Sequence, residues 1–175
     1  IQKQFFPNST RLELNVELRL PEGASIAAID AEAKRLELWL AKDKAEFDQF
    51  EHYISFVGSG APRYYLGLDQ QLPASNVSQF VIVTRDVATR EAVRGRLIKL
   101  FENEPFAARG NIARIENGPP VGYPVQYRIS GEDLATLRQA ATRVASVMRQ
   151  NSELSNVNVD WSELSKSVEI EIDQD

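Results

Sequence analysis

The stretch Arg11-Leu12-Glu13-Leu14-Asn15-Val16-Glu17-Leu18-Arg19-Leu20 decides the fold of the first part of this chain. Its apolar side chains alternate strictly with charged or amide side chains, which is the period of a β-strand with one buried and one wet face. Pro21-Glu22-Gly23 ends the alternation, because proline cannot donate to a strand ladder and glycine favours a turn. The stretch therefore predicts a strand at residues 12–20, in a sheet that is covered on one side.

Two helices and three further strands are predicted after this first strand. Ser25 is a suitable N-cap for a helix whose apolar residues are Ile26, Ile29, Ala33, Leu36 and Leu40. Strands are expected at 53–57, 77–84 and 111–115. The second helix, opened by Asp86 or Thr89, carries Val93, Leu97, Leu100 and Phe101. The order βαββαβ is the split βαβ arrangement of ferredoxin-like domains, so an α+β two-layer sandwich is predicted for residues 1–118.

The pattern restarts after Asn117-Gly118-Pro119-Pro120. Residues 121–129 alternate as a strand would, and Gly131-Glu132-Asp133 leads into a helix with the apolar stripe Leu134, Leu137, Ala141, Val144 and Met148. Further strands are predicted at 157–161 and 168–172. This βαββ order is half of a second similar domain, so residues 119–175 are expected to form a truncated second domain.

Composition and charge exclude several classes of function. The 175 residues carry a formal net charge of −5, and no cluster of lysine and arginine offers a surface for nucleic-acid phosphates. An RNA-binding module of the same topology would carry a basic, aromatic-rich strand motif that is absent here. No apolar run approaches the ~20 residues that span a bilayer. These features indicate a globular domain that does not bind nucleic acid.

The sequence contains no recognisable catalytic or cofactor-binding constellation. It has no cysteine, and its single histidine, His52, stands without a motif that presents a nucleophilic serine. Neither a phosphate-binding loop nor a His-Glu-x-x-His zinc motif occurs. The alternating carboxylates Glu169, Glu171 and Asp173 are typical of the solvated face of a strand. We therefore expect no enzyme activity, no metal and no cofactor.

A glycine-rich segment, Gly58-Ser59-Gly60-Ala61-Pro62-Arg63, is followed by Tyr64-Tyr65 and has two interpretations. It is a connector whose glycines supply positive φ, or a mobile loop that presents Arg63, Tyr64 and Tyr65 to a ligand. Tyrosine and arginine suit the second role, since one is an amphipathic aromatic plate and the other a planar charged donor. The spacing leaves both interpretations open.

Five segments in order resemble the second large periplasmic loop of resistance-nodulation-division (RND) efflux transporters of the acriflavine-resistance type. They are Phe5-Phe6-Pro7-Asn8-Ser9, Leu20-Pro21-Glu22-Gly23-Ala24-Ser25, the glycine-rich segment with its two tyrosines, Glu116-Asn117-Gly118-Pro119-Pro120-Val121-Gly122 and Ile172-Asp173-Gln174. The resemblance runs over nearly the whole chain. Each motif alone is common, and the ordered set is specific.

The resemblance implies a periplasmic porter part of a proton-driven multidrug efflux pump in the inner membrane of a Gram-negative bacterium. Such pumps are homotrimers that export hydrophobic or amphiphilic small molecules, and they work with a periplasmic adaptor and an outer-membrane channel. Residues 1–118 would be the first of the C-terminal pair of porter subdomains, and residues 119–175 the first half of the next. Contact with the membrane, and the proton relay, would lie in segments outside this chain.

The resemblance also implies a substrate-binding site. Its members would be Ile54, Phe56, Gly58, Gly60, Arg63, Tyr64 and Tyr65. The sequence departs from the well-studied drug pumps, which have phenylalanines in and around this loop, by having Ser59, Ala61 and Pro62 there. The alternative to a pump fragment is a free-standing ferredoxin-like domain that binds a small regulatory ligand.

Overall fold

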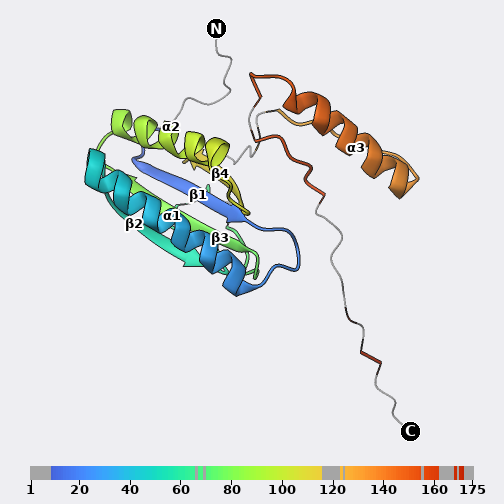
Figure 1. The fold of residues 1–175 in the computed structure, drawn as a ribbon, viewed down its shortest axis with the longest axis horizontal. Coiled ribbons are helices and arrows are strands. Elements are labelled where there is room, and N and C mark those ends of the chain that lie inside the picture. The colour runs from blue at the N-terminus through green and yellow to red at the C-terminus, as the bar shows by residue number, and fades with distance from the viewer. Residues whose placement is uncertain are drawn as a thin grey trace. The chain divides into compact units, whose positions relative to one another are not determined.

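The computed structural model describes residues 9–65, 67–68, 70–115, 123, 125–154, 156–161, 168 and 170–171. Its strands are β1 (Glu13–Arg19), β2 (Phe50–Val57), β3 (Val77–Thr84) and β4 (Arg109–Arg114). Its helices are α1 (Ile26–Phe47), α2 (Val87–Asn103) and α3 (Leu134–Arg149) (Figure 1). The chain divides into two compact units, one of Ile1–Pro120 with Leu164–Asp175 and the other of Val121–Glu163.

The four strands form one sheet in the order β2-β3-β1-β4, and every neighbouring pair is antiparallel. The predicted α+β class is confirmed, and the strand at 77–84 has the predicted bounds. The strand predicted at 53–57 instead begins at Phe50, which pairs with Thr84 across a register irregularity before His52. An irregularity of this kind breaks the alternation, so the first residues of β2 could not be recognised from their pattern.

Each helix begins at a capping side chain, and the sequence indicated the caps of α1 and α2. Ser25 Oγ accepts a hydrogen bond from the Ala28 amide at 3.2 Å. Asp86, rather than Thr89, caps α2: Asp86 Oδ1 accepts from the Thr89 amide at 2.8 Å, while Thr89 Oγ1 accepts from the Asp86 amide at 3.1 Å. In α3 the Asp133 carboxylate accepts from the Thr136 amide at 2.9 Å. Such caps satisfy amides that have no partner inside the helix.

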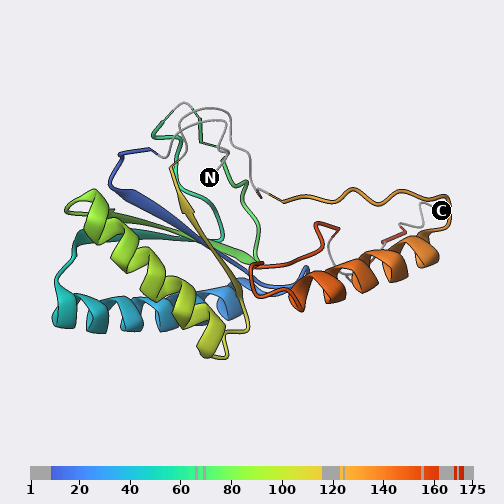
Figure 2. The ribbon, with the colours of Figure 1, turned by 90° about the horizontal axis from the view of Figure 1, so that it is seen from above.

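Both α1 and α2 cover the same face of the sheet (Figure 2). The inward side chains of β1, Leu14, Val16 and Leu18, are fully buried and form the core with the helices. The helix residues of this core are Ile29, Ala33, Leu36 and Leu40 of α1 and Val93, Leu97 and Leu100 of α2. Of the predicted stripe on α1, Ile26 in the first turn is instead half exposed. The other side of the sheet, called the open face below, is covered by neither α1 nor α2.

An ion pair joins the two helices at the edge of this core. Arg96 of α2 donates from Nε and Nη2 to the two oxygens of Asp43 of α1, at 2.6 and 2.8 Å, and Asp43 is almost fully buried. Arg96 Nη1 also donates to Gln49 Oε1 at 2.9 Å, and its guanidinium lies 4.2 Å from the centre of the Phe47 ring. One arginine therefore fixes the last turn of α1 and the segment after it against α2.

The part of the chain after residue 120 departs from the prediction. Its helix α3 is present, but the strands predicted at 121–129, 157–161 and 168–172 are wrong in the described residues of those segments, which contain no strand. Alternation fixes the face on which each side chain would lie, whereas a strand also requires a neighbour that pairs with its backbone. Ala145 is the buried residue of α3, and Leu134 and Val144 of the predicted stripe are exposed. In the described part of the chain, no helix has both the length and the apolarity to cross a bilayer.

Candidate functional site

Three rows of side chains cross the open face. Directly paired residues of antiparallel strands point to the same side of a sheet, and those beside the inward Leu14 and Val16 point away from the helices. Running from β2 through β3 to β1, the rows are His52–Val83–Glu13, Ile54–Val81–Asn15 and Phe56–Gln79–Glu17. The predicted site residues Ile54 and Phe56 therefore belong to two neighbouring rows of this face.

In the second and third of these rows, solvent exposure falls from the β2 side chain to the amide side chain of the same row. Ile54 is 53% exposed, and Phe56 and Val81 are partly exposed. The amide side chains of the same rows are buried, since Asn15 is 9% exposed and Gln79 6%. Because a buried amide requires hydrogen-bond partners, something must cover the β1 side of the open face.

The cover is the loop 58–76, which joins β2 to β3 and contains the glycine-rich segment. Gln79 Oε1 accepts a hydrogen bond from the Ala61 amide at 2.6 Å. The Tyr64 hydroxyl donates to Asn15 Oδ1 at 2.7 Å. Two side chains that point out from the sheet therefore hold the loop against it. The partners are 18 residues apart in sequence for Ala61 and Gln79, and 49 for Tyr64 and Asn15.

The base of the loop is also fixed through its backbone. The Gly58 amide donates to Val77 O at 2.8 Å, the Ala74 amide to Gly58 O at 3.0 Å and the Gly60 amide to Gln71 O at 3.2 Å. Gly58 has φ +78°, a conformation that disfavours other residues, so the connector interpretation explains this glycine. Gly60 is required by packing, because a Cβ there would lie 2.6 Å from Gln71 Cβ.

The part of the loop farthest from its hydrogen-bonded base carries the charged and aromatic residues 63–65. The rings of Tyr64 and Tyr65 meet edge to face with centroids 5.3 Å apart, and the Arg11 guanidinium lies 5.4 Å from the centre of the Tyr65 ring. Arg63 is exposed and has no hydrogen-bond or ion-pair partner among the described residues. The structure thus brings Tyr64 to the row of Ile54, with Val81 between them, and leaves Arg63 available at the surface.

Tyr64 is predicted to titrate far above an ordinary tyrosine. Burial of its hydroxyl raises the pKa of Tyr64 to about 12. A folded-state pKa above the unfolded value of about 10 gives stability that is complete below pH 10 and lost as pH rises towards 12. Tyrosinate absorbance should show one tyrosine titrating near pH 12 that is missing in Tyr64→Phe. A Tyr64 that ionises near pH 10 would show that its hydroxyl is not held against the sheet.

Sequence reasoning missed three residues of this site. Asn15 and Gln79 hold the loop against the open face, and Val81 lies between Asn15 and Ile54 in one row of that face. A signal was present for Asn15, which is the one uncharged polar residue among the outward positions 11–19 of the first strand. An amide that alternates with charged residues indicates a covered position on an otherwise wet face.

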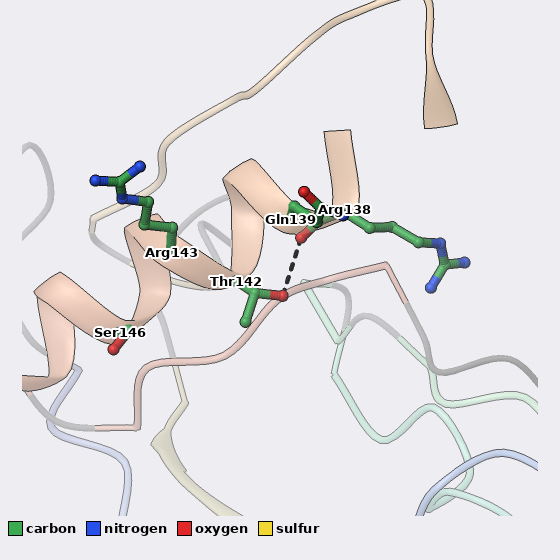
Figure 3. A pocket seen from close by; sticks show the side chains of 5 residues that line it. All are labelled: Arg138, Gln139, Thr142, Arg143 and Ser146. Atoms are coloured by element: carbon green, nitrogen blue, oxygen red, sulfur yellow. Dashed lines mark hydrogen bonds between the residues drawn. The ribbon is translucent and has the colours of Figure 1, made fainter. Parts of the chain in front are cut away.

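A second concave region lies along α3, in the other unit. It has a volume of about 430 Å³ and is lined by Arg138, Gln139, Thr142, Arg143 and Ser146 (Figure 3). All five residues belong to one helix, and Thr142 Oγ1 is already used as a donor to Arg138 O at 2.9 Å. A ligand site needs polar groups that converge from more than one side, which this surface lacks. In the described residues, no three histidine or acidic side chains gather as a metal site would require.

Comparison of the chain with models of known protein families gave no match, and comparison with curated proteins gave none either. The features that bear on function are therefore the open face, the loop that covers part of it and the ordered sequence segments described above.

Proposed function

We propose that this chain is a periplasmic porter part of an RND-type multidrug efflux pump, and that its first unit is a ferredoxin-like porter subdomain. The order β2-β3-β1-β4, with α1 and α2 as crossovers on one face, supports this topology. The five sequence segments that resemble such pumps support the family. A homotrimer, a periplasmic adaptor and an outer-membrane channel are part of the same proposal.

One observation carries the proposed site: the anchored loop and the exposed apolar residues of β2 share one face of the sheet. The loop contributes the partly exposed ring of Tyr64 and the unpaired Arg63, and the sheet contributes Ile54, Val81 and Phe56. Aromatic and aliphatic side chains bind apolar ligand surface, while a free guanidinium binds a polar end group. This combination suits an amphiphilic small molecule.

The anchors also determine which part of the loop can respond to substrate. Gly58 and Gly60 lie at the hydrogen-bonded base, so mobility of the substrate path is not expected to originate there. The exposed residues Pro62 and Arg63 lie between the Ala61 and Tyr64 anchors. Release of the Tyr64–Asn15 hydrogen bond would free residues 62–64 while the base of the loop stays in place.

The proposal is tested by export from cells. The full-length parent protein is expressed in a pump-deficient strain as wild type, Ile54→Asp, Tyr64→Ala and Leu38→Asp, the last being an exposed leucine on α1, away from the open face. Loss of one apolar or aromatic contact costs about 1–2 kcal/mol of binding, which is roughly a fivefold to thirtyfold loss of affinity. We therefore expect Ile54→Asp and Tyr64→Ala to increase susceptibility to amphiphilic compounds, and Leu38→Asp to have no effect.

Two outcomes would contradict the proposal in different ways. If all variants export every compound as wild type does, at equal protein levels, the open face is not the substrate site. If the full-length parent lacks apolar spans and confers no export, the proposed function itself is wrong. Binding of a small ligand by the isolated chain in that second case would favour the regulatory-domain alternative.

A further inference from the structure

Three arginines and one glutamate gather on the helix-covered side of the sheet, at its edge strand β4. Arg90, Glu91 and Arg94 lie within one turn of α2. Arg114 is the last residue of β4 and pairs with the core residue Leu14, so its side chain points towards the helices. These four residues are called the arginine cluster below. It lies on the opposite side of the sheet from the proposed export site.

Glu91 is fully used by two of the three arginines. Its Oε1 accepts from Arg90 Nε at 3.0 Å, Arg90 Nη2 at 2.8 Å and Arg114 Nε at 2.8 Å, and its Oε2 accepts from Arg114 Nη2. This pairing, with Arg114 first and Arg90 second, lowers the pKa of Glu91 to about 2. The carboxylate is therefore charged at every physiological pH and has little capacity left for a third guanidinium.

Arg90 has a structural role that explains its burial. It is only 2% exposed, and its Nη1 donates to the backbone carbonyl of Ser9 at 2.7 Å and also to that of Arg11. It thereby ties the segment before β1 to α2. Since its donors are taken by these carbonyls and Glu91, Arg90 supplies charge to the cluster but few free hydrogen bonds.

Among the described residues, Arg94 has no hydrogen-bond or ion-pair partner. It lies three residues after Glu91 and four after Arg90, the spacing at which helix side chains are neighbours. Its Nε is inaccessible to solvent and makes no hydrogen bond. Burial lowers the pKa of Arg94, and the nearby charges of Arg114 and Arg90 lower it further, while the charge of Glu91 opposes them. A buried unpaired donor beside like charges is costly, which is unusual in a folded protein and calls for an acceptor.

We propose that the arginine cluster is a binding site for a small-molecule oxyanion, such as phosphate or the phosphate group of a metabolite. The cluster has three positive charges against one negative charge, so a dianion would neutralise it. Guanidinium groups match the geometry of tetrahedral and planar oxyanions by paired N–H donors. Arg114, with 30% of its side chain exposed, and the partly exposed Arg94 give the anion a route from solvent.

The test measures stabilisation of the whole chain by inorganic phosphate, with chloride at equal ionic strength as the reference. A ligand that binds only the folded state raises its stability with concentration. With phosphate at about ten times its Kd, the unfolding midpoint should rise by about 5 °C for wild type. In Arg94→Met the rise should fall below about 1 °C, while the midpoint without phosphate should not decrease, because an unpaired buried guanidinium has been removed.

Two further variants keep the result interpretable. Arg85→Gln removes the same charge from an arginine that pairs with Asp48 outside the cluster, and it should retain the full response to phosphate. Glu116 follows Arg114 by two positions and lies outside the described residues, so Glu116→Gln tests whether its carboxylate takes the place of the anion; this variant should respond to phosphate as wild type does. The proposal is wrong if chloride and phosphate act alike on wild type, if Arg85→Gln loses the response as Arg94→Met does, or if phosphate stabilises only Glu116→Gln. Methyl phosphate and acetate, added separately, would show whether a phosphate ester or a carboxylate is preferred.

Discussion

Asp43→Ala is expected to lower the free energy of unfolding of the first unit by about 3–5 kcal/mol. Asp43 is 5% exposed and accepts hydrogen bonds from Nε and Nη2 of Arg96, which reaches across from α2. Removing the carboxylate leaves a guanidinium that is largely desolvated and has only Gln49 as an acceptor. The cost of such an uncompensated charge exceeds the net value of the pair itself.

The measurement is urea unfolding followed by tryptophan fluorescence. A Trp161→Phe background leaves Trp39, which packs against the core of the first unit, as the reporter. The matched control is Asp30→Ala on the same helix, since Asp30 forms an exposed pair with Lys34 at 2.5 Å and exposed pairs contribute little. The double variant Asp43→Ala/Arg96→Met should regain part of the lost stability. Equal, small effects of Asp43→Ala and Asp30→Ala would show that the interhelical pair is not desolvated.

Gly60→Ala is expected to lower the same free energy by about 1–3 kcal/mol. An added Cβ would lie 2.6 Å from Gln71 Cβ, 2.8 Å from Gln71 O and 3.0 Å from Gln79 Oε1. Gln71 O is a backbone atom and Gln71 Cβ is fixed to the backbone, so neither can rotate away from the added methyl group. The substitution should therefore displace the loop from the sheet and weaken the Ala61–Gln79 and Tyr64–Asn15 hydrogen bonds together.

Gly95→Ala is the matched control for this substitution. A Cβ at Gly95 would meet no atom within 4 Å, and Gly95 lies inside α2, where alanine is the better helix former. It should raise the free energy of unfolding by about 0.5–1 kcal/mol. Opposite signs for the two substitutions are the expected result, measured by the same urea method. If both stabilise the protein, the loop base is looser than the contacts of Gly60 indicate.

Much of the first unit could be predicted from local pattern. The alternation at 12–20, the helical spacing after Ser25 and the cap at Asp86 each depend on residues within a few positions of one another. The structure places strands and helices there, with Leu14, Val16 and Leu18 inside as the alternation requires. The pattern failed at the start of β2, where a register irregularity separates Phe50 from His52.

The candidate site was only partly visible in the sequence. Its aromatic residues and its glycines could be singled out, but the sequence left open whether the glycines make a loop mobile. The structure explains both glycines without loop mobility. Gly58 has a positive φ, and Gly60 has no room for a side chain. The residues that position Tyr64 and Ala61, namely Asn15 and Gln79, come from other strands and could not be assigned to the loop beforehand.

The sequence by itself determined the elements of the first unit, their order and the side of the sheet that the helices cover, because periodicity and caps act between near neighbours. Only the tertiary structure decided which outward side chains share a row and which amide side chains hold the loop. It also decided that Glu91 accepts hydrogen bonds from Arg90 and Arg114 and leaves Arg94 Nε without an acceptor. It also decided that residues 125–129 and 157–161 are not strands despite their alternation. The physical reason is the same in each case: a hydrogen bond or ion pair between distant residues depends on where the chain brings its partners, and alternation carries no information about the partner.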